Sequence, residues 1–303
     1  MKILVTGCSG LLGSKLVPLL AYRGYSIIGI YNIHKPSYSV NNVKLVKLDI
    51  TNTVALEDLA LKEKPDVIIH AAAYTDVDGC ERDKDGAWRI NVEATKSLVR
   101  VARVVKSYMI YISTDYVFDG SKGGYVEEDT PCPINYYGLT KLIGEELVHG
   151  SDLLYTIVRP SAIYGLGGSK KSFAEYVAEK LARNEKVKAL TDQYVSPTYN
   201  RLLAEAITEI VELRPMGILH VAGPRMNRYE FALKIAKALD LPVELVEKAS
   251  MKEMTHWIAR RPRDSSLGTD KAKKLLKKRF YDIDLAVNMF KKEWLSKRGE
   301  PCL

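Results

Sequence analysis

The stretch KILVTGCSGLLG, residues 2–13, joins a short β-branched run to three glycines spaced three residues apart. A short apolar run without polar alternation predicts a strand that is buried on both faces. Helical spacing begins directly afterwards and continues to residue 22. Glycines between a strand and a helix let the backbone approach a pyrophosphate closely, and the helix N-terminus adds positive potential. In this context between a strand and a helix, the glycines predict a dinucleotide-binding loop. The same glycines in another context would indicate only a turn.

The alternation of strand and helix continues through the first half of the chain. Short runs rich in Ile and Val predict strands at 2–6, 26–31, 43–48, 67–70, 108–113 and 155–159. Helical spacing predicts helices at 11–22, 54–62, 87–105 and 136–149. This order predicts the α/β class, specifically a doubly wound, parallel, Rossmann-type sheet with helices on both faces.

Beyond residue 160 the sequence becomes mainly helical, with helices expected at 173–183, 201–213, 228–239 and 271–276. Two further strands, near 187–190 and 217–222, are expected to rejoin the sheet. We therefore divide the chain into a dinucleotide-binding domain, residues 1–160, and a smaller, mainly helical C-terminal substrate lobe, mostly residues 161–303.

The end of the second expected strand indicates which cofactor is used. An NAD-selective site places a carboxylate there, about 20 residues past the glycines, to bind the ribose 2′-hydroxyl. This chain has Tyr31, Asn32, His34 and Lys35 there, and its first acidic residue is Asp49. Because no carboxylate would repel a 2′-phosphate, we predict NADPH as the cofactor and leave NADH open as an alternative. A solvated loop lysine is the other interpretation of Lys35.

Asp49 and Ile50 close the third expected strand, where the amino group of adenine could donate to a carboxylate. An aspartate that only caps a turn is the alternative. Both residues are assigned to the cofactor site with that alternative open.

Tyr137 and Lys141 lie four residues apart at the start of an expected helix, so their side chains share one face. An ammonium group beside a phenol favours the phenolate and lowers the pKa of tyrosine from about 10. A tyrosine of this kind can donate a proton to a carbonyl oxygen as hydride reaches the carbon. Thr114, at the end of the fifth expected strand, could hydrogen-bond the same oxygen.

Three motifs together resemble the extended short-chain dehydrogenase/reductases, and among them the dTDP-4-dehydrorhamnose reductases. They are the glycine loop at 7–13, STDYVFDG at 113–120 and YGLTKLIGE at 137–145. Further similarities run along almost the whole chain: AAAYTDVD at 71–78, INVE at 90–93, DQ at 192–193 with PT at 197–198, and RRP at 260–262 with DSSL at 264–267.

The resemblance implies NAD(P)H-dependent reduction of a nucleotide-linked 4-keto-6-deoxy sugar, specifically dTDP-4-dehydrorhamnose to dTDP-L-rhamnose. It makes Thr114, Tyr137 and Lys141 the catalytic residues, with Lys141 also binding the nicotinamide ribose. The residues assigned to the cofactor are Gly7, Ser9, Gly10, Leu11, Leu12, Gly13, Tyr31, Asn32, His34, Lys35, Asp49, Ile50, Ala71, Ala72, Ala73, Tyr74, Asn91, Ser113, Tyr137, Lys141 and Arg159. The residues assigned to the sugar nucleotide are Thr75, Val77, Thr114, Asp115, Tyr116, Ser161, Ala162, Gln193, Arg260 and Arg261.

One residue of the matching motifs and two departures from the family pattern bear on the activity. Related 4,6-dehydratases carry a glutamate after the Asp of the strand-end motif, whereas this chain has Tyr116, which argues against a dehydratase. An aromatic residue near the sugar is Ala162 here, and a family glycine is Val195. Epimerases and reductases of other nucleotide sugars therefore stay open. So does a non-catalytic NADP-binding role like that of the regulatory subunit of methionine adenosyltransferase, which looks similar.

The net charge of +8 lies entirely in residues 248–303, which hold fifteen basic and seven acidic side chains. Arginine forks bind phosphate oxygens in pairs, so we expect Arg260–Arg263 to clamp the substrate diphosphate, with a solvated turn as the alternative. Residues 271–279 are interpreted as a lysine-rich, solvated helix with Leu275 and Leu276 inward. No nucleic-acid-binding module accompanies these charges, so a nucleic-acid partner is not expected.

Composition excludes further classes. With 47% hydrophobic and 27% charged residues, the chain is typical of globular proteins. No apolar run reaches the roughly 18–20 residues of a membrane span, and strand-like sequence begins at Lys2, so we expect a cytoplasmic protein without a membrane partner. The four scattered cysteines lack metal-ligand spacing, and no metal site is expected. The oligomeric state stays open, with a homodimer as one option.

Overall fold

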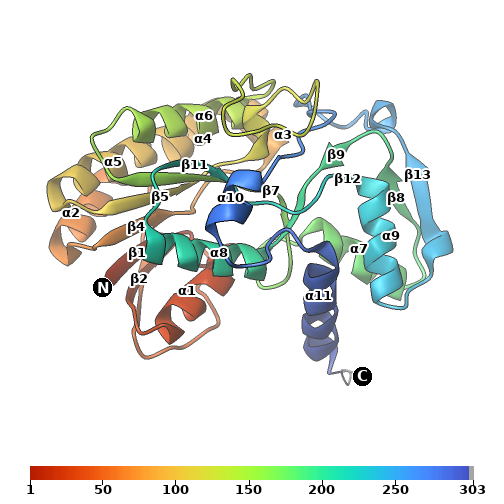
Figure 1. The fold of residues 1–303 in the computed structure, drawn as a ribbon, viewed down its shortest axis with the longest axis horizontal. Coiled ribbons are helices and arrows are strands. Elements are labelled where there is room, and N and C mark those ends of the chain that lie inside the picture. The colour runs from red at the N-terminus through yellow and green to blue at the C-terminus, as the bar shows by residue number, and fades with distance from the viewer. Residues whose placement is uncertain (300–303) are drawn as a thin grey trace.

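The computed structural model describes residues 1–299. Its centre is a seven-stranded parallel sheet in the order β11-β6-β5-β4-β1-β2-β3 (Figure 1). The strands are β1 (Lys2–Thr6), β2 (Ser26–Tyr31), β3 (Val43–Lys47), β4 (Val67–His70), β5 (Tyr108–Ile112), β6 (Tyr155–Arg159) and β11 (Gly217–His220). Strands β4, β5 and β6 are buried along their whole length, as expected for a parallel sheet covered on both faces. The predicted doubly wound α/β fold is confirmed.

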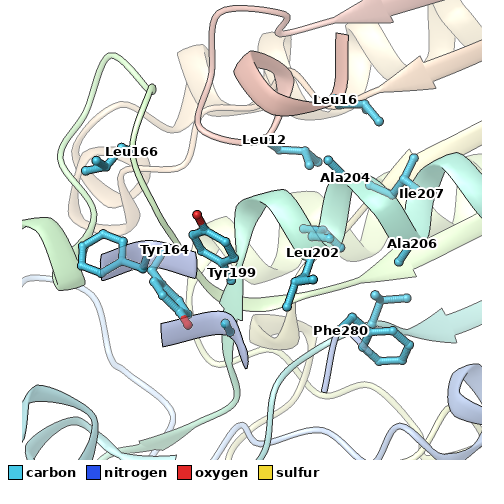
Figure 2. Packing of buried hydrophobic residues seen from close by; sticks show 14 of the residues in the cluster. Leu12, Leu16, Tyr164, Leu166, Tyr199, Leu202, Ala204, Ala206, Ile207 and Phe280 are labelled. Atoms are coloured by element: carbon cyan, nitrogen blue, oxygen red, sulfur yellow. The ribbon is translucent and has the colours of Figure 1, made fainter. Parts of the chain in front are cut away.

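Helices cover the sheet in two layers, with α1 and α8 on one face and α2, α5 and α6 on the other (Figure 1). Figure 2 shows Leu12 and Leu16 near Ala204 and Ile207 in the core beneath the first layer. The helices of the two layers are α1 (Gly13–Tyr22), α8 (Asn200–Leu213), α2 (Thr53–Glu63), α5 (Ala94–Val105) and α6 (Tyr136–His149).

The predicted helix at 87–105 is divided into pieces. A π-helical turn, η1 (Arg89–Glu93), separates α4 (Lys84–Trp88) from α5, and α3 (Val77–Arg82) precedes them. Aspartates begin the two short helices, because the side chains of Asp76 and Asp83 each accept the backbone N–H of the third residue of the helix.

The remaining segments form a C-terminal lobe beside the sheet, in which α7, α9, α11, β8 and β13 lie together (Figure 1). Three two-stranded sheets pair β7 (Ser161–Tyr164) with β10 (Pro197–Tyr199), β9 (Tyr194–Val195) with β12 (Met226–Asn227), and β8 (Val187–Leu190) with β13 (Val246–Ala249). The other elements are α7 (Phe173–Ala182), α9 (Arg228–Ala238), α10 (Asp270–Leu275), α11 (Ile283–Arg298), and the short 3-10 turns η2 (Asp115–Val117), η3 (Val243–Leu245) and η4 (Met251–Glu253).

Two expectations for this half of the chain are wrong. Strand 187–190 does not rejoin the central sheet. As β8 it pairs with β13. The edge of the central sheet is formed by β11, which pairs with β6 and contacts α10. Leu276, just past the end of α10, is buried, whereas Leu275 is exposed. The short α10 ends at Leu275, so the two leucines do not share an inner face.

Candidate active site

A cavity of about 770 Å³ runs along the carboxyl ends of the sheet strands, where residues of the C-terminal lobe close it. Its volume is ordinary for a small-molecule site. Ligands of doubly wound folds bind at this edge of the sheet. The cavity therefore coincides with the place that the fold assigns to a ligand.

The glycine loop forms one wall of the cavity by close backbone contacts. Gly7 has φ of +72°, and a Cβ atom there would lie 2.8 Å from the backbone nitrogen of Ala72. A Cβ at Gly13 would collide with the carbonyl oxygen of Gly7. Leu12, which precedes α1, offers no side-chain cap, so no side chain blocks the backbone amides at this helix N-terminus. This backbone arrangement fits the pyrophosphate of a dinucleotide.

Most residues assigned to the cofactor line the cavity. They are Gly7, Ser9, Gly10, Leu11, Leu12, Gly13, Tyr31, Asn32, His34, Asp49, Ile50, Ala71, Ala72, Ala73, Tyr74, Ser113, Tyr137 and Lys141. Lys35, Asn91 and Arg159 do not line it. Lys35 is exposed on the loop after β2, which agrees with the alternative interpretation of this residue as a solvated loop lysine.

Asp49 both lines the cavity and closes a turn. Its carboxylate accepts the backbone N–H of Thr51 at 2.9 Å and the Thr51 hydroxyl at 2.8 Å. These hydrogen bonds, led by the one from the backbone, lower the pKa of Asp49. The turn-capping alternative therefore describes Asp49 correctly. Asp49 also lines the cavity, so it stays among the residues assigned to the cofactor.

Asn91 supports the cofactor-side loop from behind. It is buried in η1, where its side chain accepts the Tyr74 backbone N–H at 2.8 Å and donates to the Tyr74 carbonyl at 3.2 Å. Its amide also donates to the Thr140 hydroxyl at 3.0 Å. Asn91 thus joins the loop after β4 to α6, and its assignment as a cofactor contact is corrected to a supporting role.

Arg159 points away from the cavity. This last residue of β6 is buried, and its guanidinium donates to both carboxylate oxygens of Glu145 at 2.9 and 2.6 Å. It also lies 5.1 Å from the centre of the Phe118 ring. The assignment of Arg159 to the cofactor is wrong, because a buried guanidinium needs a carboxylate and Glu145 of α6 provides it.

The three catalytic residues assigned from the sequence meet in the cavity. Asn135 accepts the backbone N–H of Gly138 at 2.8 Å and begins α6, which places Tyr137 and Lys141 one turn apart. Thr114 follows β5, and its hydroxyl donates to the Asp115 carboxylate at 3.2 Å. Burial raises the pKa of Tyr137 above its ordinary value, and the Thr114 hydroxyl opposes the shift.

The Lys141 ammonium does not act on the phenol as the sequence predicts. Its Nζ atom lies 4.0 Å from the centre of the Tyr111 ring, a cation–π contact. Burial lowers the pKa of Lys141 to about 7, and the Glu145 carboxylate opposes this shift. The predicted lowering of the Tyr137 pKa is wrong, because burial of the phenol raises it.

Six residues assigned to the sugar nucleotide line the cavity: Thr75, Val77, Thr114, Asp115, Tyr116 and Ala162. Asp115 accepts the hydroxyls of Ser161 at 2.8 Å and Ser265 at 2.5 Å, and burial raises the pKa of its carboxyl. Ser161 therefore supports Asp115 and does not itself line the cavity. Through Ser265, the same carboxylate fixes the C-terminal segment beside the site.

Ala162 lines the cavity in an unusual backbone conformation. Its φ is +42°, in the left-handed region that residues other than glycine rarely adopt. The strand that pairs with β7 shifts register between Pro197 and Thr198, beside this position. Strained residues of this kind cluster at functional sites, which fits a position facing the substrate.

Arg260 and Arg261 do not line the cavity, so they do not form the predicted diphosphate clamp. Arg261 donates to both oxygens of Asp78, at 3.1 and 2.9 Å, and lies 5.1 Å from the Trp257 ring centre. Arg260 has an exposed side chain. The Asp78 carboxylate of α3 thus pairs with Arg261, and this ion pair ties the C-terminal segment to the sheet domain.

Sequence reasoning missed part of the cavity wall. The additional lining residues are Ile30, Ile33, Leu48, Ile90, Ile112, Pro160, Ile163, Ser169, Lys170, Lys171, Ser172, Phe173, Val195 and Arg228. The glycine-rich run before Ser169 was a readable loop signal. Arg228 also had a signal, because the N-x-x-E pattern at 227–230 marks the start of a helix.

Comparison with known proteins gives the family. A family profile described as the RmlD substrate binding domain matches residues 1–294. The chain is 35% identical over 272 residues to the probable low-salt glycan biosynthesis reductase Agl14 of Haloferax volcanii, covering 88% of this chain and 89% of that protein. It is 30% identical over 282 residues to methionine adenosyltransferase 2 subunit beta of Pongo abelii, covering 90% and 82%.

Two solved structures share the whole fold. A hypothetical dTDP-4-dehydrorhamnose reductase from Sulfolobus tokodaii is 46% identical with a TM-score of 0.84, covering 95% of this chain and 99% of that one. The dTDP-4-dehydrorhamnose reductase of Bacillus anthracis, in complex with NADP, is 29% identical with a TM-score of 0.85, covering 96% and 99%. Fold and site together define a dinucleotide-binding protein of the extended short-chain dehydrogenase/reductase class. Within this class, the chain belongs to the RmlD substrate-binding-domain family.

Two negative findings apply to residues 1–299. No group of three or more His, Cys, Asp or Glu side chains there could hold a metal ion. Nor is any helix in this part of the chain long and apolar enough to cross a membrane.

Proposed function

We propose that this protein reduces the keto group of a nucleotide-linked 4-keto-6-deoxy sugar with NADPH, and that the substrate is dTDP-4-dehydrorhamnose. The observation that carries the proposal is that Thr114, Tyr137 and Lys141 line one cavity together with the glycine loop. The reductases among the similar structures, one of them in complex with NADP, support it.

The cavity wall favours NADPH over NADH. Its carboxylates, among the described residues, are Asp49 and Asp115. Asp49 is engaged by Thr51, and Asp115 by Ser161 and Ser265. The end of β2 itself offers Asn32 and His34, and no carboxylate that would bind the ribose 2′-hydroxyl of NADH.

The side chains divide the reaction between them. When bound, NADPH supplies a hydride, and Lys141 would bind its nicotinamide ribose. Tyr137 donates its phenolic proton to the carbonyl oxygen, and the Thr114 hydroxyl hydrogen-bonds the same oxygen and orients it. The raised pKa of Tyr137 keeps the phenol protonated at neutral pH, which is the form that a proton donor requires.

The test follows nicotinamide absorbance with and without dTDP-4-dehydrorhamnose. We expect Tyr137→Phe to lower turnover by at least about 100-fold while NADPH affinity stays unchanged, because only the proton donor is removed. Tyr136→Phe is the matched control, since this neighbouring phenol does not line the cavity. Wild-type turnover in Tyr137→Phe would refute the assignment.

A second candidate is an NADP-binding regulatory subunit, which the identity to methionine adenosyltransferase 2 subunit beta favours. In that case the protein would form a complex with a methionine adenosyltransferase catalytic subunit on size-exclusion chromatography and would oxidise no NADPH with any keto sugar. The complete set of Thr114, Tyr137 and Lys141 favours the reductase.

A further inference from the structure

One arginine of the cavity has no carboxylate partner. Arg228 lines the cavity, where its Nε atom donates to the side-chain oxygen of Gln193 at 3.4 Å and its guanidinium lies 5.1 Å from the Phe173 ring centre. Among the described residues, its two terminal amino groups have no hydrogen-bond partner, and no carboxylate forms an ion pair with it. Four N–H donors of a planar fork thus remain available in the cavity.

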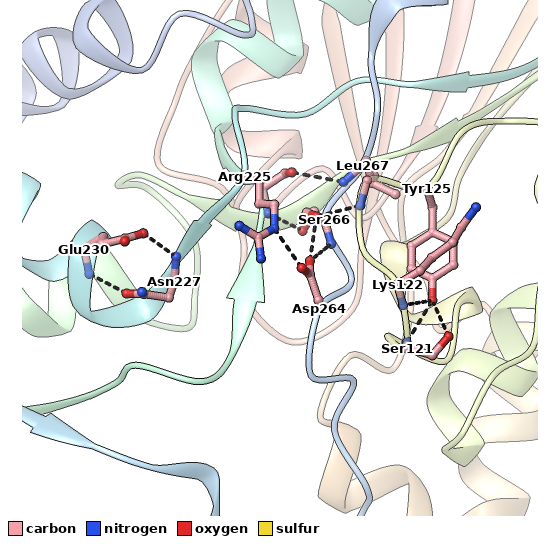
Figure 3. Close-up of polar contacts among 12 residues, drawn as sticks. Ser121, Lys122, Tyr125, Arg225, Asn227, Glu230, Asp264, Ser266 and Leu267 are labelled. Atoms are coloured by element: carbon pink, nitrogen blue, oxygen red, sulfur yellow. Dashed lines mark hydrogen bonds and ion pairs between the residues drawn. The ribbon is translucent and has the colours of Figure 1, made fainter.

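The start of α9 fixes the position of Arg228. Asn227 and Glu230 form a reciprocal capping box, with side-chain to backbone distances of 2.7 and 2.9 Å (Figure 3). The backbone N–H of Arg228 donates to the Gln193 carbonyl at 3.2 Å. The first residue of the helix is therefore held on both sides, and its side chain enters the cavity from a rigid base.

Neighbouring arginines differ from Arg228 in having carboxylate partners. Arg225 pairs with Asp264 at 2.7 Å (Figure 3). Arg261 pairs with Asp78 at 2.9 Å. Burial lowers the pKa of Arg228, while Tyr116 and then Asp115 oppose the shift. A desolvated guanidinium without a carboxylate is costly to a fold, so an anionic ligand is the natural partner.

Arg228 lies one aromatic side chain away from the catalytic phenol. The Tyr116 ring lies edge-on to the Tyr137 ring, with centres 6.0 Å apart, and Tyr116 also interacts electrostatically with Arg228, whose pKa it raises. In a nucleotide-linked sugar, the C4 keto group and the phosphate on C1 are one sugar ring apart. Arg228 and Tyr137 line the same cavity with Tyr116 between them, as a ligand that carries both groups requires.

We propose that Arg228 binds the diphosphate of the substrate, the role that the sequence analysis assigned to the Arg260–Arg263 cluster. This inference rests on the proposed function, because it takes the ligand to be a nucleotide-linked sugar. The guanidinium fork matches paired phosphate oxygens, and the low-dielectric cavity strengthens such charge-assisted hydrogen bonds.

Calorimetric titration of the full chain with saturating NADPH tests the proposal, with dTDP, UDP and thymidine as probes. Arg228→Gln is expected to weaken dTDP and UDP by roughly tenfold to hundredfold, and equally, because both carry the diphosphate. Thymidine, which has no phosphate, should bind Arg228→Gln as it binds the wild type. Arg228→Lys keeps the positive charge but lacks the planar fork, so its dTDP affinity should lie between those of the wild type and Arg228→Gln.

Arg260→Gln is the matched control, because Arg260 is exposed outside the cavity and should leave dTDP affinity unchanged. NADPH affinity and the unfolding midpoint of Arg228→Gln should equal those of the wild type, which shows that the variant folds. The proposal is overturned if Arg228→Gln keeps dTDP affinity within about twofold, if Arg260→Gln loses as much, or if the wild type binds neither diphosphate.

The outcome separates this proposal from the proposed function. Arg228-dependent dTDP binding without reduction of dTDP-4-dehydrorhamnose would support the diphosphate site and refute the reductase. Reduction of that keto sugar with an unchanged KM in Arg228→Gln would support the reductase and refute the diphosphate site.

Discussion

Lys141 is a buried cation, and its burial has a cost that depends on pH. Its pKa falls from an ordinary 10.5 to about 7 in the folded protein. Between these values the unfolded chain binds more protons than the folded chain, so this lysine makes the free energy of unfolding rise with pH across that window. Below pH 7 both states are protonated, and the full cost of the buried charge is present.

Lys141→Met is therefore expected to stabilise the fold by on the order of 2–4 kcal/mol at pH 6, with a gain that shrinks toward pH 10. Urea unfolding at pH 6, 8 and 10 measures it. Lys96→Met, at an exposed lysine, is the control and should change the free energy of unfolding little at any of the three pH values. A Lys141→Met gain that is the same at all three would contradict the argument.

The left-handed backbone of Ala162 makes a second prediction at this scale. A β-branched side chain tolerates φ of +42° poorly, so Ala162→Val should destabilise by about 1–3 kcal/mol. Ala162→Gly should change stability by less than about 1 kcal/mol, because relief of strain is offset by the entropy of glycine in the unfolded chain. Thermal unfolding of both variants checks this; equal stability of Val and Gly variants would argue against backbone strain here.

Among the elements, α6 and β6 are joined by the buried pair of Glu145 and Arg159. Removing one partner leaves an uncompensated charge, so Arg159→Met should cost about 3–5 kcal/mol in denaturant unfolding. The double variant Glu145→Leu, Arg159→Met should cost less than Arg159→Met alone, because both charges are gone. Arg103→Met, which breaks the exposed pair with Asp152, should cost at most about 1 kcal/mol. Equal losses in the two single arginine variants would show that burial adds nothing.

Elements were predictable where local sequence decides them. The bounds 136–149 of α6 match the prediction, because an Asn cap and helical spacing define that helix. Helix α11 was not predicted, although Val287, Phe290 and Trp294 have helical spacing and are buried. Strand β8 was placed in the wrong sheet, since its apolar sequence does not say which strand it pairs with.

The site was also predictable only in part, at the residues that local sequence motifs identify. Gly7, Tyr137 and Lys141 belong to local motifs, and the structure brings them to one cavity. Arg261 and Arg159 were misassigned, because an arginine fork that suits phosphate also suits a carboxylate. The partner of Arg261, Asp78, lies 183 residues away in the chain, a contact that no local pattern predicts.

Over the whole molecule, carboxylates outside the last segment offset only part of its positive charge excess. Lys297 pairs with Glu175, and Lys291 with Asp240. The lysines of these pairs are partly or fully exposed, and screening leaves such pairs little net stability. The charge that bears on a ligand is instead at Arg228, which the count of basic residues does not reveal.

Cofactor binding gives the whole-molecule prediction. A ligand that binds only the folded state stabilises it by about 2.7 kcal/mol at 100 times its dissociation constant. At equal concentration, NADPH should therefore raise the thermal unfolding midpoint more than NADH, because the end of β2 provides His34 and no carboxylate against the 2′-phosphate. Differential scanning fluorimetry with both nucleotides measures the two shifts. An NADH shift equal to or larger than that of NADPH would place the discrimination elsewhere, because the ribose and pyrophosphate contacts are common to both.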